Sequence, residues 1–157
     1  MDLDKQVEML IDNAPQDGVT PKMVRTIAPV LIAIAKKLRH LRYYILQDLQ
    51  ESWVLTTLSN RANPAQQKRV IYAYSTLQDI LATVKDDPDS KLTGIPLPVI
   101  NILFQLIALE PVDSIVFFET NSITSNGIEV KRTDLQQLIQ QKILEESRVS
   151  KLPPDIA

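Results

Sequence analysis

The chain has 157 residues, with 17 lysine and arginine residues against 19 acidic residues and a net charge of −2. It contains one histidine and no cysteine. The absence of cysteine excludes disulfide bonds, thiolate nucleophiles and thiolate metal sites. The slight negative charge also disfavours the class of generally cationic proteins that coat nucleic acid.

Two helices are expected at the start of the chain. The first runs from Leu3 to about Asn13, because apolar residues recur at helical spacing and Asp2 can cap the first turn. Thr20 followed by Pro21 predicts the start of the second helix, with the threonine hydroxyl as its cap.

A long third helix is expected from Pro29 to about Asn60. A proline inside a helix costs about 3 kcal/mol, so we expect the preceding helix to stop near Ala28 and a new one to begin at Pro29. Apolar residues then follow one another in steps of four and three, a heptad-like stripe that predicts a long amphipathic helix. The stripe comprises Ile27, Leu31, Ile34, Leu38, Leu41 and Ile45.

Two further helices are expected before the sequence changes character. Asn63 and Pro64 repeat the start signal, and apolar steps of four and three continue to Val84, where an acidic segment ends the pattern. Pro98 opens the next helix, which runs to about Leu109 and is apolar nearly all round. A helix of this kind is typical of the centre of a bundle.

Residues 114–132 are predicted to form a β-hairpin. The first run is rich in β-branched and aromatic residues, and Asn126–Gly127 between two such runs is the strongest short-range hairpin signal. A two-residue loop at this pair would place Ile123 opposite Val130 and would require a positive φ at Gly127.

Together these elements predict a mainly α-helical fold, a bundle of five to six helices with one β-hairpin before the last helix. We expect a single domain over residues 1–150, with the last helix starting near Thr133, and a disordered tail over residues 151–157. The most apolar stretch, Ile95 to Leu109, is shorter than the roughly 20 apolar residues that a membrane-spanning helix needs. We therefore expect a soluble, cytoplasmic protein without membrane insertion.

The segment KKLRHLR at residues 36–42 is the most distinctive candidate site. No acidic residue occurs between Gly18 and Asp48, and within this stretch the segment forms a cluster of cations. It predicts a cationic helix that binds nucleic acid, anionic lipid or an acidic partner. The alternative is that the acidic amino terminus shields the charges and their aliphatic stems cover apolar surface. The candidate contact residues are Lys36, Lys37, Arg39, His40 and Arg42.

The hairpin is the second candidate surface. Phe117 and Phe118 are consecutive, so in a strand their side chains point to opposite faces. One helical layer covers only one face, and a lone hairpin is marginally stable in water. Either the amino-terminal helix or a second copy of the chain is expected to cover the other phenylalanine. The second alternative makes the protein a homo-oligomer.

Two segments, LRHLRYYILQDLQESWVLTTLSNR (residues 38–61) and LQQLIQQKILEES (residues 135–147), resemble uncharacterised helical proteins of cyanobacteria and plastids. The resemblance identifies no motif and implies no activity, so it assigns no functional residue.

The sequence thus predicts a non-catalytic interaction, assembly or regulatory protein that binds a protein partner and forms homo-oligomers. The alternative is a nucleic-acid-binding module that uses the basic helix at residues 36–42. A third hypothesis is a helical enzyme that works with carboxylates and tyrosines, although no motif points to one. We expect no catalytic residue and no cofactor. We also expect no metal site, since the single histidine has no second histidine with which to share a metal.

Overall fold

The computed structural model describes residues 2–59, 62–63, 65–84, 91–119 and 127–151. Within these ranges the chain forms five helices and a six-stranded mixed sheet, so the prediction of a mainly α-helical bundle is wrong. In chain order the elements are α1 (Leu3–Asn13), α2 (Thr20–Ala35), β1 (Arg42–Gln47), β2 (Thr56–Ser59), β3 (Gln67–Tyr74), α3 (Leu77–Val84), β4 (Thr93–Pro98), α4 (Val99–Ala108), β5 (Ser114–Phe118), β6 (Gly127–Lys131) and α5 (Arg132–Lys151).

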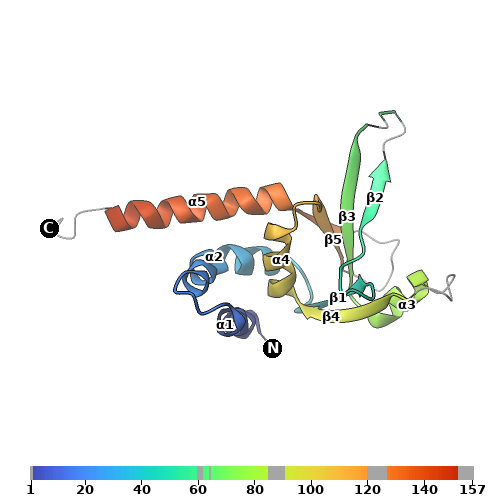
Figure 1. Cartoon of the computed structure of the whole chain (residues 1–157), viewed down its shortest axis with the longest axis horizontal. Coiled ribbons are helices and arrows are strands. Elements are labelled where there is room, and N and C mark those ends of the chain that lie inside the picture. The colour runs from blue at the N-terminus through green and yellow to red at the C-terminus, as the bar shows by residue number, and fades with distance from the viewer. Residues whose placement is uncertain (1, 60–61, 64, 85–90, 120–126, 152–157) are drawn as a thin grey trace.

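The sheet separates two helical layers of unequal size. Its strand order is β4-β1-β3-β5-β6, and β2 pairs with the first half of β3, which β1 leaves open. β3 and β5 are parallel, and the other strand pairs of the described residues are antiparallel. Helices α1, α2, α4 and α5 lie on one side of the sheet, and α3 lies on the other side (Figure 1).

Alternating strand residues fill both faces of the sheet. On the face that meets the four helices, six side chains are at most 1% exposed, namely Tyr43, Ile45, Ile71, Ala73, Ile115 and Phe117. On the opposite face, Tyr74 and Phe118 pack with the fully buried Ile80 of α3. A sheet covered on both faces has apolar residues at consecutive positions of its central strands.

The helix expected from Pro29 to Asn60 does not form. In its place the chain leaves α2, crosses to β1 and continues to β2. Tyr43 and Ile45 are buried with a period of two, which is the spacing of a strand. The step of four from Leu41 to Ile45 also fits a heptad, but Leu41 is 46% exposed and the stripe ends before it.

The helix expected to begin at Pro64 is also wrong, because β3 and the short helix α3 occupy this region. From Val70 onward β3 is buried on both faces, since it lies between β1 and β5 beneath helices on both sides. Its residues VIYAY therefore form a continuous apolar run. Periodicity alone does not distinguish such a run from a buried helix.

α2 continues through Pro29 instead of ending near Ala28. Pro29 is exposed, and the helix keeps one continuous face in the core on both sides of it. Burial of this face offsets the backbone hydrogen bond that the proline removes. The buried residues of the face are Val24, Ile27, Ala28, Leu31 and Ala35.

Asp17, rather than Thr20, organises the start of α2. Its Oδ1 accepts hydrogen bonds from the backbone N–H groups of Val19 at 2.9 Å and Thr20 at 2.7 Å. Its Oδ2 accepts the Thr20 hydroxyl at 2.8 Å, so the threonine side chain bonds to the preceding turn instead of capping the helix.

β5 and β6 pair antiparallel, as the hairpin prediction requires, but the loop is longer than two residues and the register differs. Val130 lies opposite Ile115, whereas its predicted partner Ile123 lies outside the described residues. Gly127 does not have a positive φ, so that prediction is wrong. Glycine is needed there because a Cβ would lie 2.6 Å from Cγ1 of Val116.

Three expected helices are present with small differences in their ends. α1 has the predicted bounds, and Oδ1 of Asp2 accepts a hydrogen bond from the Lys5 N–H at 2.8 Å. α4 and α5 begin within one residue of their predicted starts.

None of the described helices combines the length and apolar character needed to cross a membrane. The predicted tail falls on residues 152–157, which lie outside the described ranges, and on Lys151, the last residue of α5.

Gly94 of β4 allows α3 to approach the sheet closely. A Cβ at this position would lie 2.7 Å from Cγ2 of Ile80. We predict that Gly94→Ala lowers the free energy of unfolding by about 1–3 kcal/mol through overpacking. In an Ile80→Ala background the same change should cost markedly less, because the opposing side chain is absent. Urea unfolding of the four proteins measures both costs, and equal costs would contradict the packing explanation.

The stability of the α2 start should depend on pH. Hydrogen bonds from the Thr20 and Val19 N–H groups lower the pKa of Asp17 from 3.8 to about 2. Because the folded-state pKa is depressed, the stabilisation is present above the unfolded-state pKa and is lost as the pH falls through the folded-state value. The difference in urea midpoint between the wild type and Asp17→Asn should therefore shrink between about pH 5 and about pH 2. A constant difference over this range would contradict the assignment.

Candidate functional site

The basic segment of residues 36–42 is not a helix, contrary to expectation. Residues 36–41 connect α2 to β1, and the last residue of the segment begins β1. The structure therefore brings the five candidates together on one connection and not on one helical face. Four of them, Lys36, Lys37, Arg39 and Arg42, are exposed, and His40 is half-buried.

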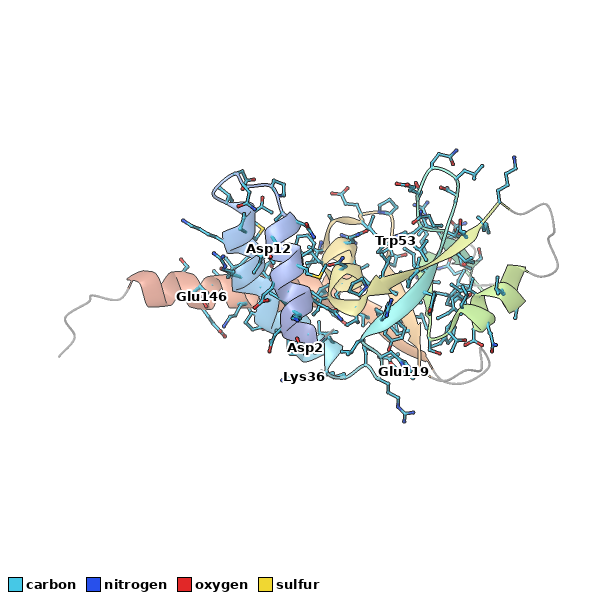
Figure 2. All side chains as sticks on the ribbon, turned by 90° about the horizontal axis from the view of Figure 1, so that it is seen from below. Asp2, Asp12, Lys36, Trp53, Glu119 and Glu146 are labelled. Atoms are coloured by element: carbon cyan, nitrogen blue, oxygen red, sulfur yellow. The ribbon has the colours of Figure 1, made fainter. Side chains whose placement is uncertain are left out.

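A buried carboxylate holds this connection against the end of β5. Glu119 directly follows β5 and is 9% exposed, and its Oε2 accepts a hydrogen bond from the Arg39 N–H at 2.8 Å. The Tyr43 hydroxyl donates to the same carboxylate, at 3.1 and 3.2 Å from its two oxygens. In the view of Figure 2, Glu119 lies along the same edge of the molecule as Lys36, with Trp53 on the opposite side. Burial, together with the neighbouring carboxylate, raises the pKa of Tyr43, so the hydroxyl remains a donor at neutral pH.

His40 is held in place by the same cluster. Its backbone N–H donates to the Tyr43 hydroxyl at 3.3 Å, and the ring nitrogen Nε2 lies 3.2 Å from the backbone carbonyl oxygen of Glu119. A carbonyl oxygen only accepts, so Nε2 carries the proton in this contact. The imidazole also meets the Tyr43 ring edge-on, at a centroid distance of 5.5 Å. These contacts position the ring, and none of them involves a nucleophile.

One glutamine ties the other side of the connection to α4. Gln6 of α1 is 2% exposed, its Nε2 donates to the Leu41 carbonyl at 2.9 Å, and its Oε1 accepts from the Ile100 N–H at 3.0 Å. The Val99 N–H donates to the same Leu41 carbonyl at 3.0 Å. These contacts satisfy two N–H groups of the first turn of α4, which the helix itself leaves without acceptors.

A cavity of about 550 Å³ lies beside this connection. Arg42 and Tyr44 of β1 pair with Pro98 and Pro96 of β4, which places their four side chains on one face of the sheet. None of the described residues that line the cavity is acidic. The rest of the lining consists of Gln6, Arg39, His40, Leu41 and Ser75.

An apolar groove of about 420 Å³ lies on the opposite side of α4, between α2, α4 and α5. Among the described residues that line it, only Gln105 has a polar side chain. The apolar side chains that define the groove are Met23, Ile27, Phe104, Ile107, Ile139 and Ile143.

The two phenylalanines of the hairpin lie inside a single chain. Phe117 is fully buried and meets the Tyr43 ring edge-on at a centroid distance of 4.9 Å. Phe118 is 8% exposed and stacks on Tyr72 at 5.5 Å. Both faces of β5 are thus covered within the described part of one chain, and Phe118 packs with Tyr72, Tyr74 and Ile80 of α3 rather than with the amino-terminal helix or a second copy.

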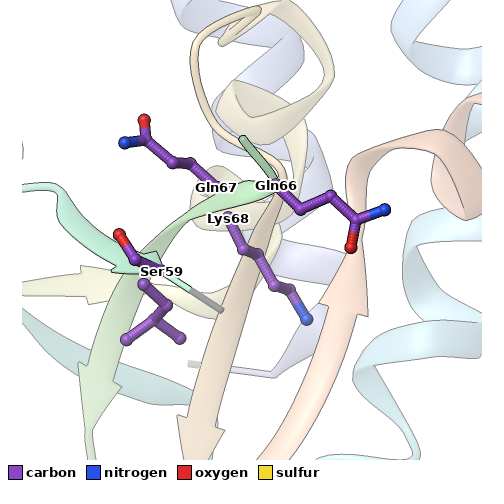
Figure 3. Close-up of a pocket in the computed structure, with 5 residues that line it drawn as sticks. Ser59, Gln66, Gln67 and Lys68 are labelled. Carbon is purple, nitrogen blue, oxygen red and sulfur yellow. The ribbon is translucent and has the colours of Figure 1, made fainter. Parts of the chain in front are cut away.

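A smaller hollow lies on the β2–β3 pair. Figure 3 shows it, about 280 Å³ in volume, at the end of the β2–β3 hairpin, where Ser59, Gln66, Gln67 and Lys68 surround it with Leu58. The Lys68 ammonium is already paired with Glu129. In the described ranges of the chain, no group of three or more histidine and acidic side chains is placed to hold a metal ion.

Sequence reasoning identified the cations of this site but missed Gln6 and Glu119. Gln6 had a legible signal, because it lies between the apolar residues Leu3 and Leu10 on one helical face and a polar residue there must find a partner. Glu119 had no signal, since its partners are about 80 residues away in the chain, as the Arg39 contact shows.

No family model matches the chain, and no curated protein is significantly similar to it. The resemblance to cyanobacterial and plastid proteins therefore stays a prediction. The function has to be argued from the geometry of the cavity and the groove.

Glu119→Ala should release the connection from β5. The Arg39 N–H and the Tyr43 hydroxyl lose their acceptor, so we predict at least about tenfold faster hydrogen exchange at the Arg39 amide and a free energy of unfolding lower by about 1–3 kcal/mol. The matched control Glu129→Ala removes a carboxylate that pairs with Lys68 instead, and it should leave exchange at Arg39 unchanged. Amide exchange followed by NMR gives the answer, and unchanged exchange in Glu119→Ala would contradict the role of the carboxylate.

Proposed function

We propose that this chain is a non-catalytic assembly protein that forms a homodimer through the apolar groove between α2, α4 and α5. The groove is the observation that carries the proposal. It has a volume of about 420 Å³ and an almost wholly apolar lining. Contiguous apolar surface that stays open to water marks the binding surfaces of folded domains.

α5 offers the surface that complements the groove. Ile143 lines the groove and is 43% exposed, and the adjacent Leu144 is 59% exposed. α5 extends beyond the other helices (Figures 1 and 2), and the described elements leave these side chains uncovered. One chain thus carries an unfilled apolar groove and an uncovered apolar helix surface next to it.

Charges at the rim favour a second α5 as the occupant of the groove. Lys22 and Arg25 flank Met23 on α2, both are exposed, and neither forms an ion pair with a described residue. The acids Glu145 and Glu146 follow Leu144 on α5. A second copy that inserts Leu144 into the groove brings its acids towards these two cations.

In the proposed dimer the contact is isologous, with the α5 of each copy in the groove of the other. A twofold axis fills both grooves at once and leaves none open for a third copy. This contact takes the place of the hairpin contact, because Phe117 and Phe118 are buried within one chain.

Leu144→Asp should dissociate the dimer without unfolding the chain. The side chain is 59% exposed in one chain, so the charge is desolvated only when two chains meet. Sedimentation equilibrium should give about twice 17.7 kDa for the wild type and 17.7 kDa for the variant. Leu81→Asp is the matched control, because Leu81 is 55% exposed on α3 and should leave the dimer intact. Thermal melting confirms that each variant remains folded.

Charge reversal tests the orientation of the two copies. Glu145→Lys with Glu146→Lys should weaken the dimer by about tenfold or more, and adding Lys22→Glu with Arg25→Glu should restore it. A wild-type monomer at every accessible concentration would overturn the proposal. A dimer that persists in Leu144→Asp would overturn it equally.

A further inference from the structure

The cavity beside the α2–β1 connection has a chemistry that the proposed assembly does not use. Its lining residues include two arginines, Arg39 and Arg42, together with His40, Tyr44 and Ser75. It shares no lining residue with the apolar groove among the described residues. Its volume of about 550 Å³ lies within the range of pockets that hold small organic molecules.

Among the described residues that line this cavity, two are cationic and none is acidic. Neither Arg39 nor Arg42 forms an ion pair with a described residue. The nearby carboxylate of Glu119 is not among the residues that line the cavity, and it accepts hydrogen bonds from the Arg39 N–H and the Tyr43 hydroxyl. The two guanidinium groups are therefore available to an anion.

The wall that carries these cations is held rigidly before any ligand arrives. Glu119 fixes the backbone at Arg39 and the ring of His40, and Gln6 fixes the carbonyl of Leu41. These side chains are themselves buried, Gln6 at 2% and Glu119 at 9% exposure. A binding wall that is already ordered loses less conformational entropy when a ligand binds.

We infer that this cavity is the binding site of a small organic phosphate, a phosphomonoester attached to a body of nucleotide size. A phosphomonoester carries a charge of about −1.5 to −2 at neutral pH, which two guanidinium groups offset. The planar guanidinium fork donates two parallel hydrogen bonds to phosphate oxygens. The cavity is far larger than a phosphate ion, and Tyr44, Pro96 and Pro98 provide a partly apolar wall for the rest of the ligand.

The positive end of α4 adds to the field at this wall, because Pro98 precedes the helix and lines the cavity. The N–H groups of Val99 and Ile100 already donate to Leu41 and Gln6. The ligand therefore binds the side chains of the cavity and not the end of the helix.

Lys36 and Lys37 distinguish this site from a nucleic-acid surface. Both are exposed on the same connection, but neither lines the cavity. A polyanion that lies along the connection would contact all the exposed cations and would release counterions from each of them. Of the four exposed cations of the connection, a ligand inside the cavity contacts only Arg39 and Arg42.

An NMR titration of the full chain tests the inference, with AMP, ribose 5-phosphate, inorganic phosphate, succinate and a short duplex DNA with hydroxyl ends as probes. We expect both organic phosphates to shift the amides of residues 39–44 and to bind at least about tenfold more tightly than inorganic phosphate or succinate. Arg39→Gln with Arg42→Gln should weaken AMP binding by at least about tenfold. The matched pair Lys36→Gln with Lys37→Gln should change it by at most about twofold, because screened charges outside the cavity contribute little.

Three results would overturn the inference. The first is the absence of binding by either organic phosphate at millimolar concentration. The second is binding of inorganic phosphate or succinate as tight as that of AMP. The third is DNA binding that is tighter than AMP binding and falls equally in both double variants, which would identify a nucleic-acid surface. The double variants remain interpretable because all four side chains are exposed, and unchanged amide spectra elsewhere confirm the fold. Since dimerisation is measured separately with Leu144→Asp, failure of one proposal leaves the other standing.

Discussion

The burial of β3 on both of its faces is the constraint on which the rest of the structure depends. β3 pairs with β1 and β2 on one side and with β5 on the other, and from Val70 onward it is largely buried. Its two faces need separate covers, and these divide the helices into a layer of four and a layer of one. Ile71 and Ala73 meet the first layer, and Tyr74 meets Ile80 in the second. The helical layers are thus a consequence of the sheet.

The same double burial explains which elements could be predicted from the sequence. α1, α4 and α5 were predictable because their apolar positions, and in α1 the Asp2 cap, are local features of each helix. The sheet was not predictable, because the residues of β3 lack the alternation that marks a strand with one exposed face. In β1 only Tyr43 and Ile45 are buried at strand spacing, while the step of four from Leu41 to Ile45 fits a heptad, so periodicity favoured the helix. The hairpin was predicted in kind but not in register, since the Asn126–Gly127 signal implied a shorter loop than the chain has.

The candidate site was half predictable for a related reason. A cluster of cations is visible in the sequence because the residues are adjacent, whereas the groups that order the cluster come from distant elements. Gln6 approaches from α1 and Glu119 from the end of β5, and each replaces water as the partner of backbone groups in the connection. Buried polar side chains of this kind are retained only where every hydrogen bond is made, because an unmade one costs free energy. Such residues are recognised once the fold has brought their partners together.

α4 reaches both proposed binding surfaces, the cavity and the groove. Its first turn is held by Gln6 next to the cationic cavity, and its later residues Phe104 and Ile107 line the apolar groove. Sites without shared contacts usually act additively, so a ligand in the cavity has no direct effect on a partner in the groove. A ligand can influence assembly only if α4 adopts two alternative placements and the ligand binds the protein more tightly in one of them. Binding of a partner in the groove must then change the affinity for the ligand by the same factor. Two contacts join the first turn of α4 to the cation-bearing connection, the pair of Gln6 hydrogen bonds and the direct bond from the Val99 N–H to the Leu41 carbonyl, and such a coupling would act through them.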